Sequence, residues 1–247
     1  MLDRRCALSY IGAGAFLIGC RHPIPPLVPL LLAPASWDSA VAWTRSLVPA
    51  NRTLIRFRWK YRDADKNYAG RAAVRIAPPD SLRIDYAGPF NWGAGAAVVV
   101  GDSTLWADPE KNFRSLVPAV RMLWAGLGIV RPPAPGAAVF GLGLGGGGGG
   151  GGADHAQGAD SNVRIWRFVQ GDDTLDYRLA SGSARVLEAE WRAQGKVFAR
   201  SRAELDVRAM PGSARIDFPE GRARFEFTVG AVDTAAVFDS TTWRRRH

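Results

Sequence analysis

Apolar and charged residues alternate along most of the chain beyond residue 50. In the stretch IRFRWKY, residues 55–61, every second residue is aliphatic or aromatic and the residues between them are basic. Because successive side chains of a β-strand point to opposite faces, this pattern predicts a strand with one apolar and one polar face. The same alternation predicts ten to eleven antiparallel strands, in the segments 55–61, 72–76, 82–86, 94–100, 103–107, 163–165, 175–179, 187–191, 197–199, 216–218 and 223–229.

Two segments lack this alternation and predict helices. Ser36 can cap a helix that runs to about Leu47, with Trp37 and Val41 spaced for one face. The stretch SLVPAVRMLWAGLGIV, residues 115–130, has a broad apolar face and predicts a second short helix. We therefore expect a mainly β, α+β fold, in which helices cover the concave face of one curved antiparallel meander.

The first twenty residues have the layout of a secretory signal. After the start MLDRR, residues 6–19 carry no charge, and this run is shorter than the roughly 20 residues that span a bilayer core. The ending LIGC, residues 17–20, resembles a bacterial lipobox, which implies cleavage before Cys20 and attachment of acyl chains to that cysteine. The alternative is a buried strand or a small apolar helix in which Cys20 has no such role.

Two segments of biased composition, one rich in proline and one rich in glycine, predict the boundaries of the domain. Residues 21–36 hold five of the sixteen prolines, which predicts an extended tether over residues 20–35. Eight consecutive glycines, residues 145–152, predict a flexible loop over residues 141–160. We expect a signal peptide at 1–19, a single domain at 36–240 that this loop interrupts, and a basic tail at 241–247.

The chain is strongly basic, with a formal net charge of +9 at pH 7. Such a charge would suggest a nucleic-acid partner in a cytoplasmic protein, but the export signal and the even spread of basic residues argue against nucleic acid. The basic residues recur at alternate strand positions, which predicts a solvent-facing outer surface. Attraction to anionic lipid headgroups is the alternative role for them.

The sequence offers little for catalysis or cofactor binding. Gly141, Gly143 and Gly146 satisfy G-x-G-x-x-G, but no helix-forming segment follows to present its N-terminus to a phosphate. The three histidines, at positions 22, 155 and 247, lie outside the predicted helices and strands. Neither a metal site nor a catalytic base is therefore expected. We expect no enzymatic activity, no metal and no cofactor.

The stretch SLRIDYAGPFNWGAGAAVVVGDSTLW, residues 81–106, and the order of the predicted elements resemble the LolA/LolB-like superfamily of periplasmic lipoprotein carriers and receptors. The resemblance covers most of residues 36–240. It implies an unclosed β-barrel whose helices form a lid over an apolar cavity that takes acyl chains. In the receptor of that family, an Asn-Pro-Leu-Gly turn helps to transfer lipoprotein into the membrane. The matching turn here contains Pro89 and Phe90, followed by Trp92, so the resemblance implies a membrane-contacting transfer loop at these residues.

Inward-facing residues of the predicted strands are the candidate lining of such a cavity. They are Phe57, Trp59, Ile84, Tyr86, Tyr177, Leu179, Phe225 and Phe227. The alternative is a packed core, which is the usual role of an apolar strand face. A continuous cavity beneath residues 115–127 would favour a carrier, and a close-packed interior would favour a scaffold.

The resemblance also implies a place in the cell envelope. Arg21, rather than aspartate, follows the predicted lipidated cysteine, which by the sorting rule of proteobacteria implies anchoring to the outer membrane, facing the periplasm. The expected ligand is an acyl chain or a lipidated protein. The expected partners are membrane lipid, through the anchor, and a periplasmic carrier or envelope protein. The second hypothesis is a non-carrier envelope lipoprotein that acts as a structural or sensing scaffold.

Overall fold

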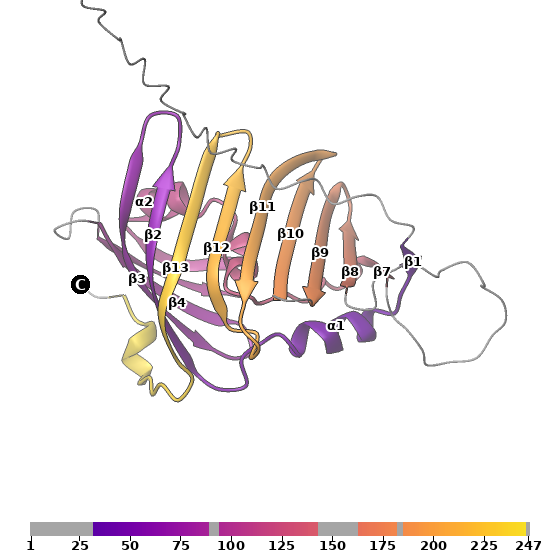
Figure 1. Cartoon of the computed structure of the whole chain (residues 1–247), viewed down its shortest axis with the longest axis horizontal. Helices are drawn as coiled ribbons and strands as arrows, with labels where there is room; N and C mark the ends of the chain where they lie inside the picture. The colour runs from indigo at the N-terminus through magenta and orange to yellow at the C-terminus, as the bar shows by residue number, and fades with distance from the viewer. Residues whose placement is uncertain (1–31, 89–93, 143–162, 182–184, 246–247) are drawn as a thin grey trace, which may run out of the picture.

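The computed structural model describes residues 32–88, 94–142, 163–181 and 185–245. Thirteen strands form one antiparallel sheet in the order β1-β7-β8-β9-β10-β11-β12-β13-β2-β3-β4-β5-β6 (Figure 1). The strands are β1 (Ala33–Pro34), β2 (Thr53–Arg62), β3 (Asn67–Ala77), β4 (Ser81–Ala87), β5 (Gly95–Val100), β6 (Ser103–Asp108), β7 (Ala138–Leu142), β8 (Val163–Gln170), β9 (Asp173–Ser181), β10 (Arg185–Ala193), β11 (Lys196–Leu205), β12 (Pro211–Phe218) and β13 (Ala223–Asp233). The end strands β1 and β6 do not pair with each other, so the sheet is not closed into a barrel.

The predicted fold class, an unclosed antiparallel meander with helices, is confirmed, but the sheet has two more strands than the alternation predicts. The two additional strands are β1 and β7. Ala33 and Pro34 of β1 pair with Gly141 and Phe140 of β7. Proline is tolerated in such a short edge strand because its missing N–H need not serve the ladder. The predicted tether therefore ends before Ala33, and the predicted loop begins after Leu142, since β7 includes Gly141.

Within the described residues, three α-helices accompany the sheet: α1 (Trp37–Arg45), α2 (Glu110–Leu116) and α3 (Val120–Gly126). The Ser36 hydroxyl accepts a hydrogen bond from the backbone N–H of Ser39 at 3.1 Å, so α1 begins at its predicted cap. The short helix predicted within residues 115–130 is present as α3, but it is shorter than the segment, whose first residues belong to the end of α2. Pro118 lies between α2 and α3, and the residue before a proline is disfavoured in the helical region.

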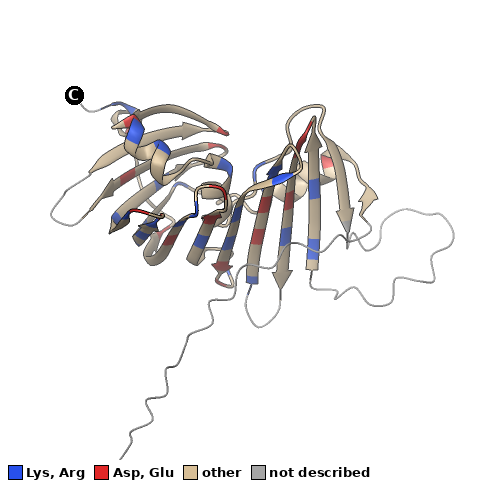
Figure 2. Ribbon diagram, turned by 90° about the horizontal axis from the view of Figure 1, so that it is seen from above, with Lys and Arg blue, Asp and Glu red and all other residues tan. Residues whose placement is uncertain are grey.

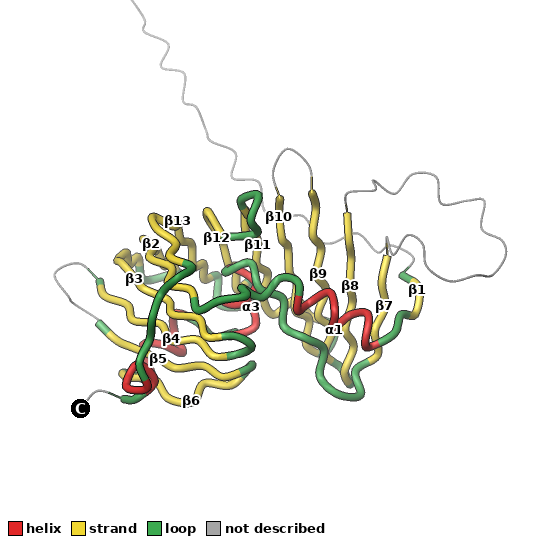
Figure 3. Tube along the Cα trace, turned by 90° about the horizontal axis from the view of Figure 1, so that it is seen from below, coloured by secondary structure: helices red, strands yellow, loops and turns green. Residues whose placement is uncertain are grey.

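Each helix covers a different part of the sheet. Trp43 of α1 stacks on Trp166 of β8. Helix α3 packs against β10, β11 and β12 (Figure 3). Helix α2 contacts β5 and β6. The apolar side chains between helices and sheet form one continuous core that includes residues from every part of the meander.

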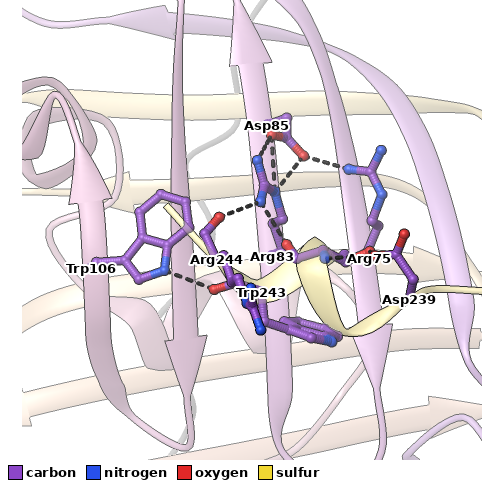
Figure 4. A network of polar contacts seen from close by, with 8 residues as sticks. Arg75, Arg83, Asp85, Trp106, Asp239, Trp243 and Arg244 are labelled. Carbon is purple, nitrogen blue, oxygen red and sulfur yellow. Dashed lines mark hydrogen bonds and ion pairs between the residues drawn. The ribbon is translucent and has the colours of Figure 1, made fainter. Parts of the chain in front are cut away.

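The C-terminal segment is packed against the sheet, in contrast to the predicted tail from residue 241. Residues Ser240–Trp243 form a short 3₁₀ helix, η2. The buried guanidinium of Arg83, on β4, donates hydrogen bonds to the Thr242 and Arg244 carbonyls at 2.6 and 3.1 Å (Figure 4). The Trp106 indole N–H donates to the Trp243 carbonyl at 3.0 Å. These contacts bind the end of the described chain to the outer face of β4 and β6.

Candidate functional site

Four of the residues singled out in the sequence lie outside the described residues. They are Cys20, the predicted lipid attachment site, and Pro89, Phe90 and Trp92, the predicted transfer loop. Their roles stay predictions. The described chain on either side of residues 89–93 belongs to β4 and β5, which pair with each other.

All eight candidate cavity residues are buried on the inner face of the sheet, and four of them pack as aromatic pairs. The Phe57 and Phe227 ring centroids are 4.6 Å apart, and the Trp59 and Phe225 centroids are 6.1 Å apart. These pairs face each other across the junction of β2 and β13, where Phe57 is opposite Val229 and Trp59 is opposite Phe227. The rings fill this part of the interior.

A second aromatic cluster fills the other half of the interior. Tyr177, which is fully buried, packs with Phe168 at 5.7 Å and with Trp43 of α1 at 6.4 Å between ring centroids. Trp166 completes the cluster. The sequence did not indicate Trp43, Trp166 or Phe168 as site residues. Which residues join this aromatic cluster depends on the strands that α1 covers, and that is set by the tertiary structure.

The interior beneath α3 is also filled. Met122, Leu123 and Trp124 are at most 1% exposed, and the Trp124 indole N–H donates to the Gly101 carbonyl at 2.8 Å. Among the described residues, the side chains of this helix are therefore closely packed against the sheet and leave little room for a continuous cavity. The close-packed interior proposed as the alternative describes this part of the domain.

An aromatic-lined pocket of about 370 Å³ remains at one end of the interior, between the β2–β3 hairpin and α2. Its lining is Trp59, Tyr61, Lys66, Tyr68, Ala69, Gly88, Lys111, Asn112, Ser115 and Leu116. Of the eight candidate cavity residues, only Trp59 lines it. The alternation along residues 55–61 includes Tyr61. No local sequence pattern indicates that Tyr68 and α2 lie beside Tyr61 in the pocket wall.

The wall of the pocket is set by a close approach of Trp59 to the backbone. Trp59 lies opposite Gly70 in the β2–β3 register, and its indole N–H donates to the Arg71 carbonyl at 3.1 Å. A Cβ at residue 70 would lie 2.7 Å from the Trp59 ring, so only glycine permits this arrangement. The indole is thereby held close to β3, and it also lines the pocket.

Two tyrosine side chains extend the wall. Tyr61 and Tyr68 stack with ring centroids 6.4 Å apart, and the Tyr61 hydroxyl donates to Asp63 at 3.1 Å. Burial, together with the neighbouring Asp63 carboxylate, raises the pKa of Tyr61 to about 12. The Tyr61 phenol is therefore neutral at physiological pH, and the aromatic part of the wall suits an apolar ligand.

Two ammonium groups stand at the rim of the pocket. Lys66 and Lys111 are exposed, and neither forms an ion pair within the part of the chain that the structure describes. An apolar chamber with cations at its mouth can hold an alkyl chain whose anionic end remains in water.

The described residues offer neither metal ligands nor a membrane-spanning helix. They contain no group of three or more His, Cys, Asp and Glu side chains that could hold a metal ion. Among the described helices, none combines the length and the apolar character needed to cross a bilayer.

Comparison with solved structures identifies the fold. The chain is similar to a domain described as an outer membrane lipoprotein-sorting protein from Vibrio parahaemolyticus, with a TM-score of 0.50, 7% identity, and coverage of 84% of this chain and 97% of that domain. It also matches a LolA superfamily protein from Nitrosomonas europaea, with a TM-score of 0.46, 10% identity, and coverage of 85% of this chain and 98% of that protein. No protein-family profile and no curated protein sequence matches the chain.

The domain therefore has a LolA/LolB-like fold, as the sequence resemblance implies. At this level of identity the likeness concerns architecture only, since one fold hosts many functions.

Proposed function

We propose that the protein is a lipid-anchored, non-enzymatic lipoprotein of the cell envelope that binds an acyl chain of a lipid or lipoprotein. The observation that carries the proposal is the aromatic-lined pocket of about 370 Å³ between β2–β3 and α2. Its volume lies within the roughly 300–1,000 Å³ of ligand pockets. The LolA/LolB-like fold, shared with a lipoprotein-sorting domain, supports the class of ligand.

In this proposal the alkyl chain lies against Trp59 and Tyr68 and is covered by Leu116 of α2. Affinity comes from removing methylene groups from water, at about 0.8 kcal/mol each. Lys66 and Lys111 attract the anionic end of the ligand at the rim. No chemical step occurs, so the protein acts by binding and release.

Filling the pocket tests the proposal. We expect the full chain with Cys20→Ala, which cannot carry its own acyl anchor, to bind a fluorescent long-chain fatty acid. The further change Ser115→Trp should weaken that binding at least tenfold, because displacing only two methylenes costs about 1.6 kcal/mol. Fluorescence titration measures the dissociation constant.

The matched control is Ala42→Trp, which adds the same ring at an exposed position of α1 outside the pocket. Equal affinities of the two tryptophan variants would exclude this pocket as the acyl site. Absence of binding by the parent chain would contradict the carrier proposal altogether.

The anchor has its own test. We expect cells labelled with a radioactive fatty acid to incorporate it into the wild-type chain and not into Cys20→Ala. Fractionation of the labelled cells should place the wild-type protein in the outer membrane. Normal labelling of the variant would remove Cys20 as the attachment site, without bearing on the pocket.

A packed scaffold is the second candidate function, and it is favoured by a specific observation. The two aromatic clusters and the helix α3 fill most of the interior. A structural or sensing lipoprotein would need no cavity and would act through its outer surface.

A further inference from the structure

The outer face of the sheet is divided into two electrostatically different parts. On β8–β11, arginines and carboxylates form a connected network in which Asp176 pairs with Arg167 at 2.6 Å and with Arg192 at 3.3 Å. Glu190, only 2% exposed, pairs with Arg192 and Arg200. Figure 2 shows both colours of charge along the strands. The arginines of this network are therefore neutralised within the fold.

The outer face of β2 and β3 is different. Arg56, Arg58 and Arg71, which we call the arginine cluster, are exposed, and their side chains form no hydrogen bond or ion pair within the described part of the chain. Arg58 and Arg71 are directly opposite each other in the antiparallel register. Like charges in such a pair destabilise a sheet. The fold thus retains electrostatic repulsion between the Arg58 and Arg71 guanidinium groups, which a bound anion would reduce.

The arginine cluster surrounds a shallow hollow. This hollow, of about 440 Å³, is lined on its outer side by the three arginines and by the small residues Ala73, Ala87 and Gly230. Gly230 is the extra residue of a bulge in β13, where the register with β2 shifts between Val229 and Ala231. Asp85 also lines the hollow, but its carboxylate is paired with Arg75 and Arg83.

We propose that the arginine cluster is a docking site for the phosphate-bearing headgroups of an anionic phospholipid bilayer. Guanidinium groups bind phosphate oxygens bidentately, and small side chains between them leave room for the headgroup. Arg56 and Arg58 are two residues apart on one strand, so they lie about 7 Å apart along it and can contact separate phosphates. This surface is on the opposite face of β2 and β3 from the acyl pocket, and the proposal does not depend on that pocket.

The test uses the full chain with Cys20→Ala, so that no acyl anchor contributes to membrane binding. We compare its partitioning onto phosphatidylcholine vesicles with and without phosphatidylglycerol, by sedimentation. The parent should prefer the anionic vesicles, and Arg56→Gln/Arg58→Gln/Arg71→Gln should lose roughly 100-fold of that binding, at about fivefold per basic residue near an anionic surface. Binding to pure phosphatidylcholine should not change.

A matched control removes the same charge elsewhere. Arg45→Gln/Arg164→Gln/Lys196→Gln alters three exposed basic residues that have no ion pair among the described residues. Equal losses in the two triple variants would show that only net charge matters and would overturn the docking site. Unchanged binding of the arginine-cluster variant would overturn it too and would direct the search to an acidic protein partner. Circular dichroism melting verifies that both variants are folded.

Discussion

Replacing Trp166 by alanine is expected to lower the free energy of unfolding by about 3–5 kcal/mol. The Trp166 side chain is 1% exposed and stacks on Trp43 at 5.7 Å, so its removal leaves a cavity between α1 and the sheet. The indole N–H has no hydrogen-bond partner among the described residues. The loss is therefore one of packing alone, and urea unfolding followed by circular dichroism measures it.

Trp37 provides a control of the same residue type. It lies on α1 but is 41% exposed, and Trp37→Ala should change the free energy of unfolding by less than about 1 kcal/mol. A similarly small effect at Trp166 would mean that the interior under α1 is not tightly packed. That result would favour a larger cavity over the filled interior.

Removing the carboxylate of Asp85 should cost about 3 kcal/mol of the free energy of unfolding. Asp85 accepts hydrogen bonds from Arg83 Nε at 3.0 Å and Nη2 at 2.7 Å, and it also pairs with Arg75 (Figure 4). Arg83 is 2% exposed. Breaking a buried pair from one side leaves an uncompensated charge, which typically costs about 3–5 kcal/mol. We take the lower end because the Asp85 side chain is 33% exposed.

The appropriate control is an ion pair in solvent. Glu110→Ala breaks the pair with Arg114 on α2, whose side chains are 61% and 75% exposed, and should cost only about 0.3–0.5 kcal/mol. Chemical denaturation of Asp85→Ala and Glu110→Ala compares the two. If both lose equally little, the Arg83 network does not stabilise the fold.

The Asp85 variant has a second, local readout. Arg83 donates to the carbonyls of Thr242 and Arg244, so its displacement should release the C-terminal segment. Trypsin should then cleave after Arg244 faster than in the wild-type chain, under conditions in which both are folded. Unchanged cleavage would indicate that Trp106, which donates to Trp243, holds the segment by itself.

Local patterns determined the strands and one helix start. Alternation at residues 55–61 and 223–229 places one face of β2 and β13 inside because side-chain direction in a strand depends only on neighbouring residues. The helix cap at Ser36 also depends only on neighbouring residues, because the Ser36 hydroxyl bonds to the backbone of Ser39. The break at Pro118 could also have been foreseen from the preference of the preceding residue for extended backbone.

Pairing between distant segments was decided only by the tertiary structure. Ala33 and Pro34 become a strand through β7, more than one hundred residues away, and β2 lies beside β13 at the centre of the sheet. The pocket exists because α2 approaches the β2–β3 hairpin, and the arginine cluster exists because the register places Arg58 opposite Arg71. Periodicity along the chain specifies which face of a strand is apolar. Register and neighbours depend on burial summed over the whole core, so they are properties of the assembled fold.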